Sequence, residues 1–236
     1  NDFVYFKFRD TFFNRFTHIH CPSNMIANQL RDHGYTARLH VISNGISPQY
    51  TYGRSPQEDW MRGMFNVLMV GRYAGEKRQD VLIDACAQCR HKDRIQVILA
   101  GKGPLEKKYR HLAQKLPNPV VMEFYEPSRL LEILHMADLY VHTSDAEIEA
   151  MSCMEAFACG LVPIIADSPR SATPQFALDE RSLFPAGNPA ALAEKIDWWF
   201  EHPAEREEMG KRYAVHAEQY ALDRSIEQTE EMFRLA

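Results

Sequence analysis

Two carboxylates offer the first chemistry that the sequence suggests. Glu147 and Glu155 are separated by seven residues and lie between an apolar run at 139–144 and a second one at 161–166. This order predicts a strand, a loop, a helix and a strand. Ligands of open α/β sheets bind beyond the carboxyl ends of the strands, so we expect both carboxylates at one crevice. Such a pair could act as the general acid and base of a hydrolase, or it could accept hydrogen bonds from ligand hydroxyls.

The helix that carries Glu155 is expected to begin near Glu149 or Ala150 and to stop at Gly160, because glycine is favoured just past a helix end. Glu147 would then lie in the loop above the sheet edge. The start of this helix is a possible anion site, since its first N–H groups have no partner within the helix.

Several groups near this helix have competing interpretations. The amides of Ser152 and Cys153 could bind a phosphate. Cys153 is not expected to be a nucleophile, because the sequence shows no histidine partner or oxyanion motif near it. His135 and His142 lack metal-ligand spacing and are interpreted as packing or surface residues.

Two glycine-bearing loops follow the first two strands of the same pattern. The first contains Gly71 and Gly75 together with Arg72 and Lys77, which could hold a diphosphate or could simply be a solvated loop. The second loop, 101–104, reads Gly-Lys-Gly-Pro. It lacks the third glycine of a dinucleotide fingerprint and follows the second strand, so alone it indicates no more than a strand-to-helix turn.

The regular alternation of strands and helices predicts an α/β fold, with a Rossmann-like parallel sheet, helices on both of its faces and a helical C-terminus. The expected strands are 66–70, 95–99, 120–124, 139–142 and 162–166. Helices are expected at 80–89, from Pro104 to 116, from a Ser128 cap to 137, and from Pro189, Pro203 and Leu222 onward.

The sequence divides into four parts. Residues 1–45 contain two short strands and a helix and look like the last unit of another α/β domain; 46–63 form a linker rich in turn residues; 64–220 form the main domain; and 221–236 form a C-terminal helix. The first part is rich in aromatic residues, which we expect to pack against a domain that this sequence lacks; a membrane-interfacial segment is the alternative. These aromatics are Phe3, Tyr5, Phe6, Phe8, Phe12, Phe13 and Phe16.

Composition narrows the function classes. The 236 residues are 45% hydrophobic and 25% charged, and the net charge of −5 argues against a general nucleic-acid binder. No apolar run approaches the roughly 20 residues that cross a bilayer. Five cysteines, an odd and low number, favour a reducing compartment, so we expect a cytoplasmic location, with the inner face of the membrane left open. Cys86 and Cys89 are interpreted as ordinary helix residues, because no second pair completes a metal site.

The order of these features resembles that of the retaining GT-B glycosyltransferases of family 4, the glycosyl transferases group 1. The resemblance covers about residues 17–235 and rests on several motifs taken together. They are Gly71-Arg72 with Lys77, Gly101 to Pro104, Glu147 with Glu155, Gly160 to Pro163, and Ser43 to Ile46 at the entry to the second domain.

The resemblance implies that the chain is the donor-binding domain of an enzyme that transfers a sugar, with retention, from a UDP- or GDP-sugar to a lipid or saccharide. Arg72 and Lys77 would hold the diphosphate, Glu147 the transferred sugar and Glu155 the ribose, with Arg72, Lys77 and Glu147 as the catalytic set. The implied donor-binding set is Gly71, Gly103, Ser128, Leu130, Ile148, Met151, Ser152 and Glu155, with the base near residues 125–130. The family needs no metal for catalysis and no cofactor beyond the donor, and no nucleic acid is expected as a partner.

The sequence departs from the family pattern in places that bear on specificity. Ile148-Glu149-Ala150 replaces the usual Gly-Phe-Gly after the first glutamate, and Tyr125 replaces a glycine after the third strand. The version present here resembles enzymes that put glucose on diacylglycerol lipids.

Most of the family's first domain, with its catalytic histidine, is absent from the sequence. We therefore expect a chain that binds donor but hardly turns over, with any membrane contact made through the absent domain. A GT-B epimerase or phosphorylase and a non-catalytic binding module are the alternatives, and the paired glutamates argue against the module.

Overall fold

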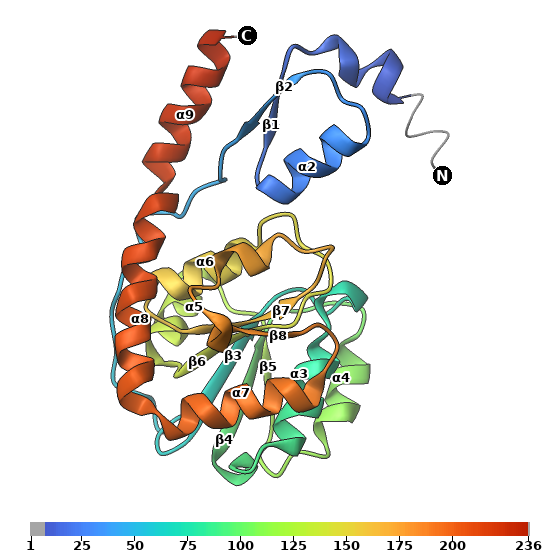
Figure 1. Ribbon diagram of the computed structural model, residues 1–236. Coiled ribbons are helices and arrows are strands. Elements are labelled where there is room, and N and C mark those ends of the chain that lie inside the picture. Colours follow the sequence, from blue (N-terminus) through green and yellow to red (C-terminus); the bar gives the residue numbers. More distant parts are fainter. Residues whose placement is uncertain (1–7, 236) are drawn as a thin grey trace.

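The computed structural model describes residues 8–235, and its main part is a six-stranded parallel sheet (Figure 1). The strand order is β5-β4-β3-β6-β7-β8. The predicted α/β fold is confirmed, and the five predicted strands form within one or two residues of the expected positions. The strands are β3 (Phe65–Val70), β4 (Ile95–Ala100), β5 (Val121–Glu123), β6 (Leu139–His142), β7 (Pro163–Asp167) and β8 (Leu183–Pro185).

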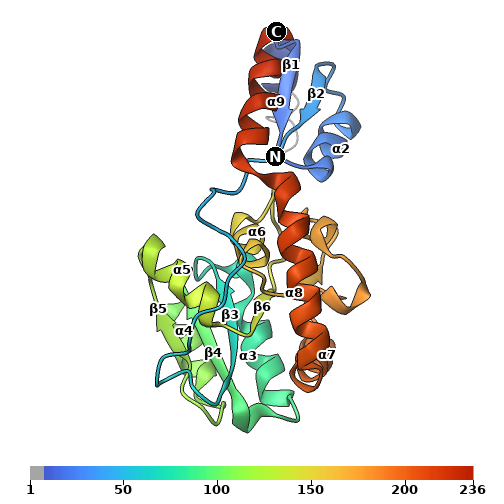
Figure 2. The ribbon, with the colours of Figure 1, turned by 90° about the vertical axis from the view of Figure 1, so that its left-hand side faces the viewer.

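Helices cover both faces of this sheet. Helix α3 packs against α4 and α7 on one face, and α6 packs against α8 on the other, where α5 also lies (Figures 1 and 2). Proline stands in the first turn of α5, α7 and α8, where its missing N–H costs no hydrogen bond. The helices are α3 (Gln79–Gln88), α4 (Glu106–Ala113), α5 (Pro127–Met136), α6 (Met151–Ala158), α7 (Pro189–Glu201) and α8 (Pro203–Ala217). Short 3-10 turns are η2 (Gly75–Lys77), η3 (Lys92–Arg94), η4 (Thr173–Phe176), η5 (Glu180–Ser182) and η6 (Glu218–Tyr220).

A smaller unit precedes the sheet. Strands β1 (His18–Cys21) and β2 (Arg38–Val41) pair in parallel, and α2 (Asn24–Asp32) connects them after the short turn η1 (Phe13–Arg15). The side chain of Ser23 caps α2 by accepting a hydrogen bond from the Ile26 N–H, as an N-cap serine does. The last helix, α9 (Leu222–Leu235), returns to lie beside this unit (Figures 1 and 2).

The chain crosses twice between the small unit and the main sheet, and the two crossings are paired. The Ile46 N–H donates to the Tyr220 carbonyl at 2.7 Å, and the Leu222 N–H donates to the Ile46 carbonyl at 3.0 Å. Gly45 has a φ of 83°, and a Cβ there would lie 2.7 Å from Leu222 Cα. This crossing therefore requires glycine for its conformation and for the close approach of the second segment.

Three expectations about local structure are wrong. Strand β8 was not predicted, because its three residues end in a proline and give no readable periodicity. Helix α5 is capped by Glu126 without a side-chain hydrogen bond, and Pro127 takes the first helical position, so Ser128 is not the cap. Pro104 lies in a turn before α4, which begins at Glu106.

The aromatic N-terminal segment is only partly described. Phe3, Tyr5 and Phe6 lie outside the described residues. The four later phenylalanines, Phe8, Phe12, Phe13 and Phe16, are 40–58% exposed. Their packing against another domain stays a prediction. Among the described residues, no helix has the length and apolarity required to span a membrane.

Candidate functional site

The site lies where the strand order of the sheet reverses. Strands β4 and β5 extend from one side of β3, and β6, β7 and β8 extend from the other. Loops that leave β3 and β6 therefore diverge, and their divergence opens a crevice at the carboxyl ends of these strands. The loop after β3 begins at Gly71, and the loop after β6 contains Glu147.

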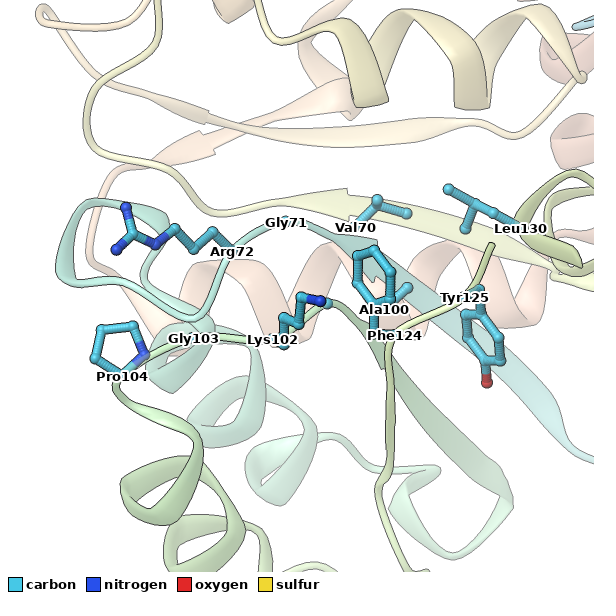
Figure 3. Close-up of a pocket in the computed structure, with 11 residues that line it drawn as sticks. Val70, Gly71, Arg72, Ala100, Lys102, Gly103, Pro104, Phe124, Tyr125 and Leu130 are labelled. Carbon is cyan, nitrogen blue, oxygen red and sulfur yellow. The ribbon is translucent and has the colours of Figure 1, made fainter. Parts of the chain in front are cut away.

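A cavity of about 460 Å³ opens on the β3 side of this crevice (Figure 3). Its volume falls in the range of small-ligand sites. Figure 3 shows Arg72 and Pro104 at one end of the cavity and Tyr125 and Leu130 at the other. The cavity therefore offers a cation at one end and apolar groups at the other. Its lining consists of Val70, Gly71, Arg72, Ala100, Gly101, Lys102, Gly103, Pro104, Phe124, Tyr125 and Leu130.

Two glycines bring the second loop against the first. A Cβ on Gly101 would lie 2.0 Å from the Gly71 carbonyl oxygen, and one on Gly103 would lie 2.6 Å from the Tyr73 carbonyl oxygen. The Tyr73 N–H donates to the Lys102 carbonyl at 3.1 Å, which holds the two loops together. Gly103 thus lines the cavity as expected, and the structure adds a second reason for glycine there, the packing of loop on loop.

A lysine, a histidine and a glutamate meet beside the cavity. Lys77 Nζ and His142 Nε2 both donate to Glu147 Oε1, the histidine at 3.1 Å. A Cβ on Gly71 would lie 3.7 Å from Lys77 Cδ, so Lys77 lies against the cavity wall. His142, interpreted as a packing or surface residue, is buried with its side chain 1% exposed, and it makes a contact with Glu147 that was not predicted.

The electrostatics of this cluster favour an ionised Glu147. Burial by itself raises the pKa of Glu147, but the hydrogen bond and charge of His142 and those of Lys77 together outweigh burial and hold the pKa at about 2. Glu147 is therefore a carboxylate at neutral pH and can act only as a hydrogen-bond acceptor. This state excludes Glu147 as a general acid at neutral pH.

His142 is connected to the start of α6 through Tyr140 and Ser152. Its Nδ1 lies 3.5 Å from the Tyr140 hydroxyl, which donates to Ser152 Oγ at 3.1 Å. Ser152 Oγ in turn donates to the Val70 carbonyl at 3.3 Å. The Ser152 side chain thus joins β3, β6 and α6, and its backbone N–H belongs to the first turn of α6, where N–H groups have no partner within the helix.

Two other predicted contacts at the crevice differ from expectation. The Cys153 N–H donates to the Ala150 carbonyl at 3.0 Å, so it is not available to a phosphate. Ser128 is exposed and does not line the cavity, whereas Leu130, one half-turn later on α5, does. Ile148, on the loop after β6, is 58% exposed, and Met151 is half-buried at the start of α6.

The two predicted cations, Arg72 and Lys77, differ in the partners of their side chains. Arg72 is exposed, and its side chain makes no hydrogen bond or ion pair with residues 8–235. Lys77 is engaged by Glu147, but an ammonium group has three donors, and one is sufficient for that contact. Arg72 and Lys77 can therefore both face an anion at this end of the cavity.

Glu155 lies half-buried on α6, and it has a hydrogen-bond partner, Tyr50, that the sequence did not indicate. Burial raises the pKa of Glu155, and a hydrogen bond with Tyr50 of the linker partly opposes this effect. Within residues 8–235 no cation compensates the carboxylate, in contrast to Glu147. A buried acceptor without a charge partner is suited to hydroxyl donors from a ligand.

Ala150 adopts a left-handed conformation just before α6, with φ 61° and ψ 63°. This conformation costs a non-glycine residue about 1–2 kcal/mol. Ala150→Gly is therefore expected to raise the stability of the chain, with the gain reduced to about 0.5 kcal/mol by the greater freedom of glycine in the unfolded state. Urea unfolding of the two proteins measures the difference, with Ala158→Gly inside α6 as a control expected to destabilise. A loss of stability for Ala150→Gly would show that the strain argument fails.

No group of three histidine, cysteine, aspartate or glutamate side chains within 8–235 is placed to hold a metal ion. The chemistry that the arrangement offers is electrostatic: Arg72 lines the cavity, Lys77 and the Glu147 carboxylate lie beside its wall, and Ser152 ties the start of α6 to Val70 of the lining.

Comparison with known families agrees with this arrangement. The family model of the glycosyl transferases group 1 matches residues 57–215, and that of glycosyltransferase family 4 matches residues 2–50. The catalytic domain of cholesterol-alpha-glucosyltransferase from Helicobacter pylori is 52% identical, with a TM-score of 0.65; the match covers 66% of this chain and 99% of that domain. Anabaena HepE, solved in complex with UDP and glucose, has the same fold at 22% identity, with a TM-score of 0.82 over 93% of this chain and 64% of that one.

Curated relatives are more distant and much longer. A GDP-mannose-dependent alpha-mannosyltransferase of Corynebacterium glutamicum is 29% identical over 67% of this chain, and an alpha-monoglucosyldiacylglycerol synthase of Streptococcus pneumoniae is 24% identical over 62%. The matched part spans only 37% and 36% of these two proteins. The family model covers most of the sheet, its loops and both glutamates, and it confirms the resemblance seen in the motifs. The chain belongs to the glycosyl transferases group 1 family of GT-B glycosyltransferases.

Proposed function

We propose that the complete protein transfers glucose from UDP-glucose to the hydroxyl of a membrane lipid, a sterol in the first place, with retention of the α configuration. The observation that carries this proposal is the 52% identity to the catalytic domain of a cholesterol-alpha-glucosyltransferase. At such identity a shared donor and acceptor class is a reasonable expectation. The same acceptor class, a lipid hydroxyl, occurs in the name of the pneumococcal relative.

The geometry supports the donor half of the proposal. The base would occupy the apolar end of the cavity near Tyr125 and Leu130, and the ribose hydroxyls would donate to Glu155. The diphosphate would lie between Arg72, Lys77 and the N-terminus of α6, where two cations and a helix dipole act on it together. Glu147, held ionised, would accept from hydroxyls of the glucose.

The proposed reaction needs the chain mainly to stabilise a leaving group. The bond between glucose C1 and the β-phosphate oxygen breaks while the acceptor oxygen attacks C1 from the same face. The acceptor proton passes to the departing phosphate oxygen, and the negative charge that develops on UDP is stabilised by Arg72 and Lys77. This assignment gives the two cations their largest effect in the transition state rather than in the bound donor.

The chain alone is expected to bind donor and to transfer little. The part of the chain that matches spans 37% and 36% of the two curated relatives described above. The activity of the complete protein is therefore the quantity to test.

The test is a transfer assay with the full-length protein, labelled UDP-glucose and vesicles that contain either cholesterol or diacylglycerol. The expected result is a labelled sterol glucoside whose H1–H2 coupling identifies the α anomer. If diacylglycerol is glucosylated and cholesterol is not, the acceptor is diacylglycerol and the proposed sterol is wrong. A β-linked product would overturn retention, and interconversion of the nucleotide sugar without transfer would overturn glycosyl transfer itself.

A further inference from the structure

A third glutamate of the same stretch is more deeply buried than the two that face the donor site. Glu149 is 3% exposed, and its carboxylate accepts three hydrogen bonds from a single residue, Asn44. The Asn44 backbone N–H lies 3.3 and 3.0 Å from the two carboxylate oxygens, and Asn44 Nδ2 lies 2.6 Å from Oε2. A buried carboxylate is costly unless it is hydrogen-bonded, so this pair of residues is strongly specified.

Asn44 belongs to the segment where the chain enters the main domain. It follows β2 and precedes Ile46, whose backbone pairs with Tyr220 and Leu222 of the returning segment. The side chain of Asn44 also lines a cavity of about 250 Å³ between the small unit and α9. Any rotation of the small unit relative to the main sheet must therefore act on Asn44.

Glu149 belongs to the loop 147–150, which we call the donor loop. Its first residue is held from the opposite side: the Glu147 N–H donates to the Arg170 carbonyl at 3.4 Å, and the Ala172 N–H donates to the Glu147 carbonyl at 3.0 Å. Its last residue, Ala150, has a positive φ. Two anchors, the 170–172 segment and Asn44, thus fix a strained loop that carries Glu147.

We propose that Glu149 is a positioning residue that, through Asn44, couples the donor loop to the paired crossing between the small unit and the main sheet. The coupling keeps Glu147 where the transferred sugar lies only while the crossing holds its present geometry. This inference rests on the proposed function, since it assigns the donor sugar to Glu147. It predicts that loss of the Asn44–Glu149 contact lowers the affinity for the sugar part of the donor and leaves the affinity for the nucleotide part unchanged.

The test exchanges the hydrogen-bond donor and the hydrogen-bond acceptor between the side chains of Asn44 and Glu149. Glu149→Gln places an amide opposite the Asn44 amide, and Asn44→Asp places a carboxylate opposite Glu149, so each single variant loses a charge-assisted hydrogen bond. The double variant restores one donor and one acceptor with reversed roles. Glu194→Gln, on the exposed side of α7, makes the same charge change as Glu149→Gln and is the matched control.

Calorimetric titration of the 236-residue chain with UDP-glucose and with UDP gives the readout. Each single variant is expected to bind UDP-glucose about tenfold more weakly and UDP within about twofold of wild type, because the loop that carries Glu147 loses one of its two anchors while the groups that face the nucleotide are unchanged. The double variant is expected to recover UDP-glucose affinity to within about twofold, and the control to match wild type.

Other outcomes separate the coupling from the proposed function. If the wild type binds UDP-glucose and the single variants bind it equally well, the coupling is overturned and the function stands. Equal losses for UDP and UDP-glucose with no recovery in the double variant would mean that Glu149 only maintains the fold, which also overturns the coupling. Failure of the wild type to bind any UDP- or GDP-sugar would overturn the proposed function and the coupling together.

Discussion

Glu155→Gln is expected to weaken UDP binding by about 10- to 100-fold and, at the same time, to stabilise the empty chain at neutral pH. The loss follows from the proposed ribose contact, because hydrogen bonds to a charged acceptor are worth about 1.5–3 kcal/mol each. The gain follows from the setting of the carboxylate, which is half-buried and has no cation partner in the part of the chain that the structure describes. A residue that costs stability while it serves binding is typical of a functional site.

The pH dependence of this gain has a definite sign. Burial raises the pKa of Glu155 above its unfolded value, so the folded state holds its proton more tightly than the unfolded state does. The carboxyl group therefore costs stability at pH values above its unfolded pKa, and this cost disappears as the pH falls below that value. Glu155→Gln should raise Tm at pH 7, and the difference from wild type should shrink toward pH 4.

Differential scanning calorimetry from pH 4 to 8 measures the stability, and titration with UDP measures the affinity. Glu194→Gln serves as the charge-matched control and should change neither. If Glu155→Gln binds UDP as tightly as wild type, Glu155 does not contact the ribose. If the variant has a lower Tm than wild type at pH 7, Tyr50 and the surroundings compensate the buried carboxylate fully.

Lys77→Ala is expected to lower the rate of sugar transfer by the full-length protein by about 10²- to 10³-fold. This is the usual effect of removing one preorganised donor from a site where charge develops. Lys77 faces both the cavity and Glu147, so its loss removes a cation from the leaving diphosphate and frees Glu147 from one of its two partners. Initial rates with saturating UDP-glucose provide the measurement, and Lys107→Ala on the exposed side of α4 is the control.

The same variant tests the charge of Glu147. The depressed pKa of Glu147, about 2, contributes stability above the unfolded pKa of about 4.5, and this contribution is lost as the pH falls from there toward 2. Without Lys77 the pKa should rise, so the stability difference from wild type should be largest above pH 5 and should diminish in acid. A difference that grows in acid, or a rate that stays within threefold of wild type, would contradict the assigned pair.

Sequence reasoning identified the layers of the fold because its signals are local. Proline at 189 and 203 marks helix starts, and apolar runs of four to six residues mark buried parallel strands. Strand β8 escaped detection because three residues ending in Pro185 carry no period. The Ser128 cap failed because the preceding proline takes the first helical position.

The site was found in part, and the missing part consists of contacts between distant residues. The motifs place Arg72 and Gly103 at the cavity and Glu147 at the crevice, but the bond from Lys77 to Glu147 joins residues 70 positions apart. The contact of His142 with Glu147 was not predicted because a single histidine shows no spacing, although its place at the end of β6 was a signal. The contacts of Glu149 with Asn44 and of Glu155 with Tyr50 were not predicted, because each joins residues more than 100 positions apart.

The cysteines have a practical consequence. All five thiols are free, and none is more than 3% exposed. Burial also raises the pKa of the Cys153 thiol well above its usual range, which suppresses the reactive thiolate. Modification by a bulky thiol reagent must therefore wait for the chain to open. Cys153 lies in α6 and Cys159 directly follows it, on either side of Glu155 in the sequence. The labelling rate of these two thiols therefore measures the rate at which α6 opens, and a bound ligand is expected to lower that rate.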